Sequence, residues 1–359
     1  MARFLLIDGM STYQPGFFDE SERLAALSKL HDPLEQLSRY IDFEQFRAQL
    51  DEVFSREEKQ ATGRRPYDAV LMLKILILQR LYHLSDEQVE FQITDRLSFT
   101  RFLELKLGSK IPDFFTGWRF REALSGAGVV KDLFNRFTRH LEEKGVIGKT
   151  GMIVDASFVE VPRQRNSREE NKKIKEGTVP PAWKDDPDKL AHKDVDARWT
   201  KKNHETFYGY KDHVRTDADT VLITDYVVTD AAVHDSQVLD QLVGEKDRGR
   251  KLWADSAYKS VATDRQLQEW KIDNQIHEKG ARNRPLTKAQ KAHNRQKSRI
   301  RCLVEHVFGH MATSMRGPEL AYIGLKRITS GVGLANLAYH MCRFTQLIRL
   351  GRVEVAATA

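Results

Sequence analysis

Apolar residues recur at helical spacing along the first part of the chain. The run AVLMLKILILQRLYHL, residues 69–84, is apolar around most of a helix, and residues 32–54 carry apolar positions every three or four residues. Ser85 and Gln88 have the spacing of a capping box, which predicts that another helix begins after Ser85. Two more helices are expected over residues 111–124 and 129–147. We therefore predict a helical N-terminal region over residues 1–145.

The hydrophobic period changes near residue 151. The segment GMIVDASFVEV, residues 151–161, is rich in branched residues that alternate as in a strand. Residues 206–217 and 220–230 have the pattern of an antiparallel hairpin. Short strands are then expected at residues 250–255 and 273–278, and helices at residues 234–245, 260–271, 288–312 and 334–350. This order predicts an α+β or mixed α/β fold with helices packed on a sheet over residues 146–350, followed by a tail over residues 351–359.

A charged segment interrupts this second region. Residues 163–203 carry many side chains of both signs and few apolar ones, and they contain Pro180, Pro181 and Pro187. Segments of this composition rarely bury enough apolar surface to order by themselves. We therefore predict a long exposed loop or insertion at this point.

Composition and charge narrow the class of protein. The chain has 359 residues, of which 40% are hydrophobic, so it can bury the core of two or three domains. Its formal net charge is +7, and residues 279–304 contain many Lys and Arg and no acid, which favours a polyanionic partner. The two cysteines, Cys302 and Cys342, exclude a disulfide framework and a four-thiolate zinc site. No apolar run is long enough to span a bilayer, so we expect a cytoplasmic protein without a membrane partner.

Three acids stand at positions suited to a shared site. Asp155 lies inside the first predicted strand, where a carboxylate is costly to bury unless it is paired or bound to a metal. Asp255 ends a later strand, and Glu305 lies on the basic helix four residues after Arg301, on the same helix face. Three carboxylates suffice to hold two Mg²⁺ ions for phosphodiester chemistry, because Mg²⁺ prefers oxygen ligands and keeps waters in its shell.

Each acid alone also has an ordinary structural explanation. Asp255 is typical of a turn or a helix cap, and Glu305 with Arg301 is typical of a surface ion pair. Asp155 is the hardest to explain in this way. The sequence has no G-x-x-x-x-G-K-[ST] motif, so no nucleotide cofactor is expected.

Seven blocks in this sequence resemble bacterial insertion-sequence transposases of the DDE type, and specifically the insertion-sequence-five (IS-five) family. Residues 63–105 and the block PDFFTGWRFREAL resemble the N-terminal region of that family. The blocks GMIVDAS, GYKDH, VHDSQVL, ADSAY and RIRCLVEHVFG follow in the order of its catalytic domain. The resemblance covers about residues 30–350.

The resemblance implies a ribonuclease-H-like catalytic fold with Asp155, Asp255 and Glu305 as catalytic and metal-binding residues. It implies two Mg²⁺ ions, for which Mn²⁺ can substitute. The partners it implies are double-stranded DNA, as terminal inverted repeats and target DNA, and a second copy of the chain in at least a homodimer. The helical region would bind the ends and contribute to dimerisation, and cleavage would free 3′-hydroxyl groups that join target DNA. The setting is a bacterial cytoplasm and nucleoid.

The sequence departs from the related transposases at Phe114, Phe115 and Gly117 and at two positions of one signature. Their Tyr-Arg-Glu-Lys signature places a Tyr where this chain has Ser298 and a Lys where it has Ala312. Arg301 and Glu305 fit the signature. Arg301 is therefore the residue expected to contact phosphate or to orient Glu305.

Further residues are candidates for contacts around this site. His213, His234 and Tyr258 lie in the matched blocks and have either supporting or purely structural roles. Trp118 is either part of a recognition surface or part of the core. The candidate DNA contacts are the cations Arg301, Arg299, Lys297, Arg295, Lys291, Lys288, Arg284 and Arg282, together with Arg119, Arg121, Arg64 and Arg65.

Two rival functions keep the same fold. One is a DNA-binding, repressor-like protein that has lost its chemistry, and the other is a structure-selective nuclease that does not join strands. The intact set of three acids argues against the first, and joined DNA products would exclude the second.

Overall fold

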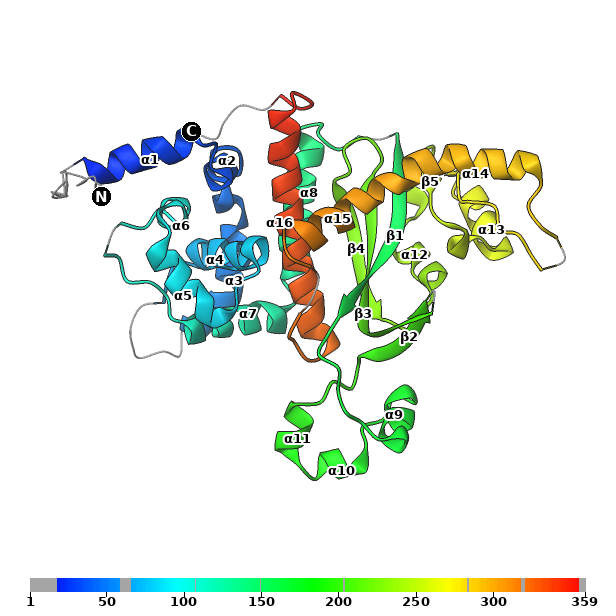
Figure 1. The fold of residues 1–359 in the computed structure, drawn as a ribbon, viewed down its shortest axis with the longest axis horizontal. Helices are drawn as coiled ribbons and strands as arrows, with labels where there is room; N and C mark the ends of the chain where they lie inside the picture. The colour runs from blue at the N-terminus through cyan, green and yellow to red at the C-terminus, as the bar shows by residue number, and fades with distance from the viewer. Residues whose placement is uncertain are drawn as a thin grey trace, which may run out of the picture.

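The N-terminal region of the computed structural model is helical, as the sequence predicts (Figure 1). The structure describes residues 18–58, 66–106, 108–148, 150–202, 204–282, 284–317 and 320–354. The helices of the N-terminal region are α1 (Asp19–Lys29), α2 (Pro33–Tyr40), the 3₁₀ helix η1 (Phe43–Phe46), α3 (Arg47–Glu58), α4 (Ala69–Tyr82), α5 (Asp86–Asp95), α6 (Leu97–Phe102), α7 (Phe114–Ala127) and α8 (Val130–Glu143).

Short polar side chains set the beginnings of these helices. The carboxylate of Asp68 accepts a hydrogen bond from the Leu71 backbone N–H at the start of α4. The capping box of Ser85 and Gln88 is confirmed at the start of α5. The stretch with helical spacing over residues 32–54 forms separate helices, because Ile41 is extended and Asp42 caps the helix η1. Local capping thus divides a continuous apolar pattern into several helices.

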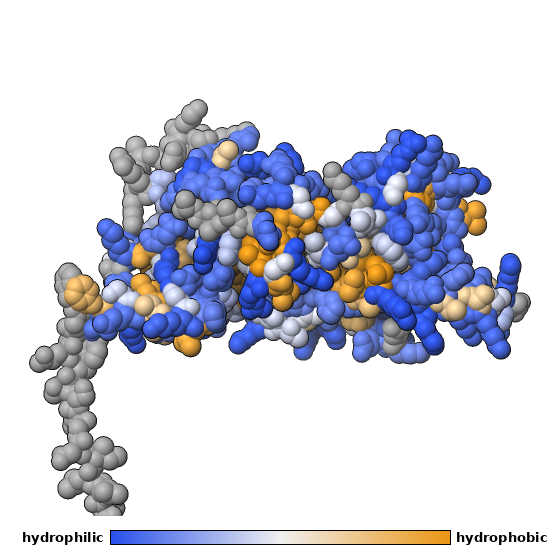
Figure 2. Space-filling model, turned by 90° about the horizontal axis from the view of Figure 1, so that it is seen from above, coloured by the Kyte–Doolittle hydropathy of each residue, from blue (hydrophilic) through white to orange (hydrophobic). Residues whose placement is uncertain are grey.

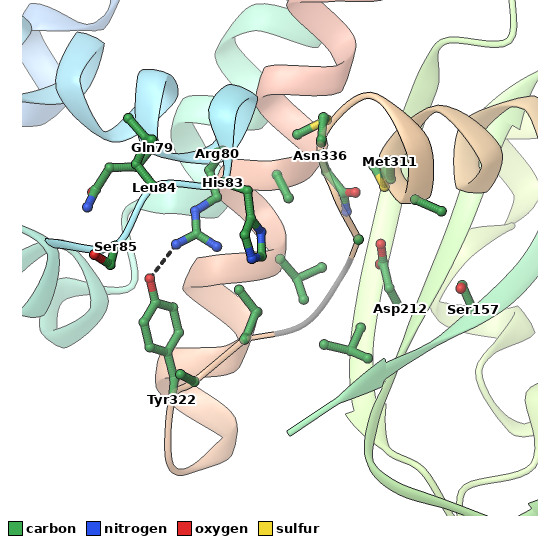
Figure 3. A pocket seen from close by; sticks show the side chains of 18 of the residues that line it. Gln79, Arg80, His83, Leu84, Ser85, Ser157, Asp212, Met311, Tyr322 and Asn336 are labelled. Atoms are coloured by element: carbon green, nitrogen blue, oxygen red, sulfur yellow. Dashed lines mark hydrogen bonds between the residues drawn. The ribbon is translucent and has the colours of Figure 1, made fainter. Parts of the chain in front are cut away.

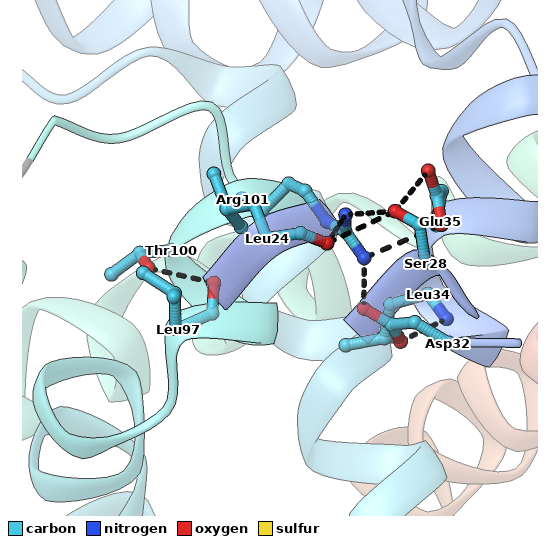
Figure 4. A network of polar contacts seen from close by, with 8 residues as sticks. All are labelled: Leu24, Ser28, Asp32, Leu34, Glu35, Leu97, Thr100 and Arg101. Carbon is cyan, nitrogen blue, oxygen red and sulfur yellow. Dashed lines mark hydrogen bonds and ion pairs between the residues drawn. The ribbon is translucent and has the colours of Figure 1, made fainter. Parts of the chain in front are cut away.

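A polar network joins three helices of this region (Figure 4). Arg101 on α6 donates to the Asp32 carboxylate at 2.6 Å and to the Ser28 hydroxyl at 2.9 Å. Ser28 in turn donates to Glu35 at 2.9 Å. Since Ser28 lies on α1 and Glu35 on α2, one guanidinium fixes the first two helices against α6.

A mixed sheet follows the helical region. Strand β1 (Gly151–Glu160) pairs antiparallel with β3 (Glu205–Asp217) and parallel with β5 (Lys251–Trp253). Strands β2 (Arg198–Lys202) and β4 (Ile223–Asp230) pair with β3, and β6 (Asp273–Asn274) continues the parallel side beyond β5. Three antiparallel strands on one side of β1 and two parallel strands on the other make a ribonuclease-H-like sheet. The predicted fold class is confirmed.

Both faces of the sheet are covered. Ile153 of β1 packs into a core shared with the helices, and its neighbours Met152 and Val154 pack into a second cluster on the opposite face.

The remaining elements are η2 (Asp235–Gln237), α12 (Leu239–Leu242), η3 (Glu245–Asp247), η4 (Ser256–Tyr258), α13 (Val261–Glu269), α14 (Lys288–Arg301), η5 (Cys302–Val304), α15 (Glu305–Thr313) and α16 (Leu325–Arg349). The helix expected over residues 234–245 is therefore only two short turns, and that over residues 288–312 is interrupted by η5.

The charged segment after β1 is folded, so of the two predicted alternatives the long exposed loop is wrong and the insertion remains. It forms α9 (Arg168–Lys175), α10 (Pro181–Lys184) and α11 (Pro187–Ala191), which extend below the sheet in Figure 1. Trp183 is fully buried there, and its indole N–H donates to Glu170 at 2.7 Å. One aromatic side chain thus supplies a core that the low apolar content of the segment concealed.

Helix α16 joins the helical region to the sheet. It lies between the two in Figure 1 and packs against α8, α4 and β4. Buried residues of both regions belong to one continuous cluster. Within the described ranges, none of the helices combines the length and hydropathy that a membrane span requires.

His340 is buried at the centre of this junction. Its ring lies 5.4 Å from the ring of Phe134 and 5.2 Å from that of Phe137, and it is fully buried. Burial lowers the pKa of His340 to about 3. Between pH 6.5 and about pH 3, the folded protein therefore keeps this histidine neutral, whereas the unfolded chain, with an ordinary pKa of about 6.5, protonates it.

Replacement of His340 by Leu should make the protein more resistant to acid. In the wild type, protonation of His340 in the unfolded chain costs about 1.4 kcal/mol of stability for each pH unit below 6.5, until the folded pKa is reached. Urea unfolding at pH 7.5 and pH 5 should show about 2 kcal/mol less acid destabilisation in His340→Leu. The exposed His192→Leu provides the control, and an unchanged pH slope in His340→Leu would contradict this account.

Candidate active site

Two of the three predicted acids meet because β1 and β5 are parallel and in register. Ile153 pairs with Trp253, and Asp155 and Asp255 each follow two residues later. The two carboxylates therefore lie beside each other where the parallel pairing ends, Asp155 in the middle of β1 and Asp255 just after β5. Asp255 also caps η4, since its carboxylate accepts from the Ala257 N–H at 2.7 Å.

Arg301 connects the third acid to this edge of the sheet. Its guanidinium donates to Asp155 at 2.9 Å and to Glu305 at 3.0 Å. Arg301 ends α14 and Glu305 begins α15, one helical turn later. The short helix η5 between them keeps both side chains on one face.

All three predicted acids line one cleft of about 300 Å³. Asp155 contributes from the strand, Asp255 from the loop after β5 and Glu305 from the helix. Arg301 also lines the cleft. The remaining lining residues are Ala156, Ser157, Phe158, Lys202, Glu205, Phe207 and Phe308.

The electrostatics of Asp155 reflect this crowding. Its side chain is only 13% exposed. The pKa of Asp155 is raised to about 6, chiefly because the carboxylate is buried and also because Asp255 and Glu305 lie near it. The Ala156 N–H and the Arg301 guanidinium act in the opposite direction. An added positive charge at this cleft would therefore favour the ionised carboxylate.

The chemical type of these ligands suits a hard divalent cation. Three carboxylates offer the oxygen ligands that Mg²⁺ prefers. In the part of the chain that the structure describes, however, no three acidic, histidine or cysteine side chains already stand close enough to enclose an ion. Arg301 instead lies between Asp155 and Glu305, so these two would have to release its guanidinium before sharing a metal.

Two comparisons identify the family. The profile of the transposase DDE domain family matches residues 147–341, which is more than half of the chain. This chain is a DDE transposase. A second profile, the transposase domain designated DUF772, matches residues 22–123. The predicted recognition as an insertion-sequence transposase is confirmed.

One solved structure shows a weak overall likeness to this chain. It is the cryo-electron microscopy structure of the piggyBac transposase synaptic complex with hairpin DNA. The two chains are 12% identical with a TM-score of 0.45, and the match covers 92% of this chain and 78% of the other. The likeness is weak, and the family membership does not depend on it.

The structure places the three predicted supporting residues differently. His213 is fully buried on β3, next to β1, and its Nε2 lies 2.9 Å from the Thr229 hydroxyl. His234 caps η2 through Ser236 and does not line the cleft. Tyr258 is buried behind the cleft, and burial together with nearby carboxylates raises the pKa of its hydroxyl well above the ordinary value. Of the three residues, Tyr258 is the one whose pKa is raised by the charges of Asp155 and Asp255.

The predicted basic run is only partly helical. Helix α14 begins at Lys288, so Arg282 and Arg284 lie before it, where Ala281 and Arg284 pair through two backbone hydrogen bonds. Lys297 donates to the Ile276 carbonyl at 2.9 Å and thus holds the helix to the loop after β6. The other cations of the run before Arg301 are exposed: Arg282, Arg284, Lys288, Lys291, Arg295 and Arg299.

One of the DNA contacts predicted in the helical region is wrong. Arg121 was expected at a DNA surface, but it is buried and both its terminal nitrogens donate to Asp86 at 2.6 Å. Arg119 is exposed on the same helix, beside Phe115. Trp118 is 40% exposed and stacks on Phe115, so it belongs to a surface patch and not to the core. Arg64 and Arg65 lie outside the described residues.

Sequence reasoning missed three residues of the cleft. Phe158 and Phe207 stack with ring centroids 4.1 Å apart, and Lys202 lies 5.7 Å from the Phe158 ring. Lys202 falls in the segment taken for a loop. The aromatic residues Trp199 and Phe207 lie on the two paired strands β2 and β3 and are typical of strands. The charged residues between them hid this pattern in the sequence.

Arg301→Gln should destabilise the metal-free transposase by about 1–3 kcal/mol, because it leaves the buried Asp155 without a cation. In an Asp155→Asn background, the same substitution should lower the free energy of unfolding much less. Urea unfolding of the four proteins in EDTA gives the coupling energy, which we expect to exceed about 1 kcal/mol.

The pair Arg327 and Glu122 is a matched control for this cycle. It is also in contact, at 2.8 Å, but both side chains are more exposed, so its coupling should stay below about 1 kcal/mol. Additive effects at Arg301 and Asp155 would mean that the bridge does not stabilise the site.

Proposed function

We propose that this protein is an active, metal-dependent transposase of the IS-five family. It binds the terminal inverted repeats of its own element, cleaves at their ends and joins the freed 3′-hydroxyl groups to target DNA. The observation that carries the proposal is the convergence of Asp155, Asp255 and Glu305 on one cleft. These residues come from three distant segments, and such a meeting of acids beside a basic helix suits phosphodiester chemistry.

The side chains of the cleft divide the work. Asp155, Asp255 and Glu305 would hold two Mg²⁺ or Mn²⁺ ions. When bound, these ions would activate the attacking oxygen and stabilise the leaving oxygen. Arg301 holds Asp155 and Glu305 in place before the ions bind and turns to a DNA phosphate afterwards. Lys202 supplies a second positive charge in the lining of the cleft.

The exposed cations before Glu305 give DNA a path to the cleft. Residues 279–304 contain no acid, and the exposed cations Lys288, Lys291, Arg295 and Arg299 follow one another along α14 towards Glu305. Contacts of this kind bind the phosphate backbone without reading sequence. Recognition of the repeat sequence then falls to the helical region, where Arg119 and Trp118 are exposed on α7. A dimer would bring the two ends of the element together in the bacterial nucleoid.

Asp155→Asn, Asp255→Asn and Glu305→Gln should each reduce cleavage more than about a hundredfold while DNA binding is kept, because each removes a ligand. The substrate is DNA that spans both flanks of the gene, incubated with Mg²⁺ or Mn²⁺ and with EDTA. Discrete cleavage and joined products should appear only with the wild type and metal. The exposed Glu269→Gln serves as the matched control.

The outcomes separate the rival functions. Retarded but uncut DNA with the wild type would favour a DNA-binding protein without chemistry. Cleavage without joined products would favour a nuclease. Cleavage that survives Glu305→Gln would show that the third carboxylate is misassigned.

Removal of three exposed cations from α14 should weaken DNA binding in a salt-dependent way. In Lys291→Gln/Arg295→Gln/Arg299→Gln, the slope of log affinity against log salt should fall by about 3, since each phosphate contact contributes about 0.9. Gel retardation between 50 and 300 mM KCl measures it. The triple change Lys172→Gln/Lys173→Gln/Lys175→Gln on α9 is the control, and an equal fall there would mean that α14 has no special role.

A further inference from the structure

A groove of about 890 Å³ lies along helix α15, on a different face of the helix from the catalytic cleft. His306, His310 and Thr313 line this α15 groove, whereas Glu305 and Phe308 line the cleft. Glu305 and Phe308 also line a cavity of about 830 Å³ between α4 and the sheet (Figure 3). The α15 groove is therefore separated from the catalytic acids by one helix, which is about 10–12 Å across.

The other walls of the α15 groove come from four segments that are far apart in the chain. They are the start of α2, the end of α4, the turn between β3 and β4, and the C-terminal part of α16. Helix α2 and the end of α16 lie on the upper side of the molecule in Figure 1. Figure 2 shows this side from above, with apolar residues exposed in its middle between hydrophilic flanks. The apolar lining of the groove includes Leu37, Leu303 and Tyr339.

Three guanidinium groups in the α15 groove lack an acidic partner. Arg343, Arg349 and Arg352 line it, from the last turns of α16 and the residues after that helix. Among the described residues, no carboxylate forms an ion pair with any of them. Arg343 donates to the Thr220 carbonyl at 2.7 Å and to the Gln346 side chain at 2.6 Å. Burial and the charge of nearby Arg352 lower the pKa of Arg343, so the two guanidinium groups repel each other.

The charge of the α15 groove is only partly explained by the helix that carries it. Arg349 and Arg352 suit the C-terminal end of α16, where the helix dipole favours cations. This effect falls off within the last turn, so it does not account for Arg343. Among the described residues that line the groove, Asp219 is the one acid. The groove thus has an excess of positive charge and suits a polyanion.

We propose that the α15 groove holds the phosphate backbone of target DNA during the joining step. The proposal rests on the proposed function and names a surface for its second DNA substrate. In joining, the 3′-oxygen of the element loses its proton to solvent and bonds to a target phosphorus, and the target's own 3′-oxygen leaves and takes up a proton. This target phosphate must enter the catalytic cleft, so the duplex that carries it passes next to α15. Guanidinium groups are well suited to bind its other phosphates, because they donate paired hydrogen bonds.

The dimensions of a duplex fit this arrangement. The major groove of DNA is about 12 Å wide and admits a helix, and α15 separates the cleft from the α15 groove by a similar distance. The exposed side of this helix is small in profile, since Gly309 and Ala312 lie there. No atom beyond its own helix backbone and chain neighbours lies within 4 Å of the position that a Cβ on Gly309 would take. One target strand would then lie at Glu305 and the other at Arg343.

The first experiment separates cleavage from joining in Arg349→Gln/Arg352→Gln. Neither arginine lines the catalytic cleft, so cleavage of DNA that carries the element end and its flank should stay within about twofold of the wild type. Joining of pre-cut ends to a plasmid should fall about tenfold or more, because two phosphate contacts to the target are lost. A merely structural role of the arginines would lower both activities together.

The second experiment measures binding in EDTA and does not depend on catalysis. One DNA is the pre-cut element end, and the other is the same end already joined to two target arms. The wild type should bind the branched DNA more tightly. In the double variant, the slope of log affinity against log salt should fall by about 2 for the branched DNA, since each phosphate contact contributes about 0.9. The slope for the pre-cut end should not change.

Lys246→Gln/Arg248→Gln removes the same charge from exposed positions outside the α15 groove and is the matched control. Thermal melting verifies that each variant is folded, and Arg349→Gln alone replaces a double variant that is not. Arg343→Lys extends the series, because it keeps the charge but loses the paired hydrogen bonds, and it should reduce joining less than Arg343→Gln.

Each outcome supports or overturns the proposal. Joining and binding slopes equal to those of the control overturn it and leave the proposed function in place. Cleavage and joining that fall together also overturn it, since the groove then serves the element end or the fold. An unchanged slope on branched DNA with normal joining would favour an acidic protein segment as the occupant. A wild type that neither cleaves nor joins contradicts the proposed function, while the binding slopes still decide whether the groove holds DNA.

Discussion

The bridge that Arg301 makes between Asp155 and Glu305 is the interaction on which the site depends. Asp155 is nearly buried within a strand, and an ionised carboxylate there is unfavourable without a positive neighbour. The guanidinium supplies that neighbour and at the same time fixes the helix that carries Glu305. The cleft is therefore shaped before any ion or DNA arrives. A cation that replaces the guanidinium can use the same two carboxylates.

A second constraint is the core shared by the helical region and the sheet. Helix α16 packs against α8 and α4 on one side and β4 on the other, so the two regions cannot move as independent bodies without exposing apolar surface. His340 lies in this core without a hydrogen-bond partner from the described residues and stays neutral there. DNA held by the helical region would in consequence be held at a fixed distance from the cleft.

Helix α15 gives the site its spatial organisation. Glu305, at its start, lines the catalytic cleft, and Glu305 and Phe308 also line the cavity between α4 and the sheet. The basic helix α14 precedes α15 in the chain, with only η5 between them.

The sequence alone determined most of the elements and the choice of three candidate acids. Apolar periodicity and capping residues located most helices, and an acid inside an apolar strand singled out Asp155, because both signals are local. Tertiary structure decided what no local signal contains: the parallel register that sets Asp155 beside Asp255, the bridge through Arg301, and the burial of Arg121 against Asp86. It also decided that the charged segment after β1 folds. These features depend on contacts between residues far apart in the chain, and periodicity reports only on the neighbours of each residue.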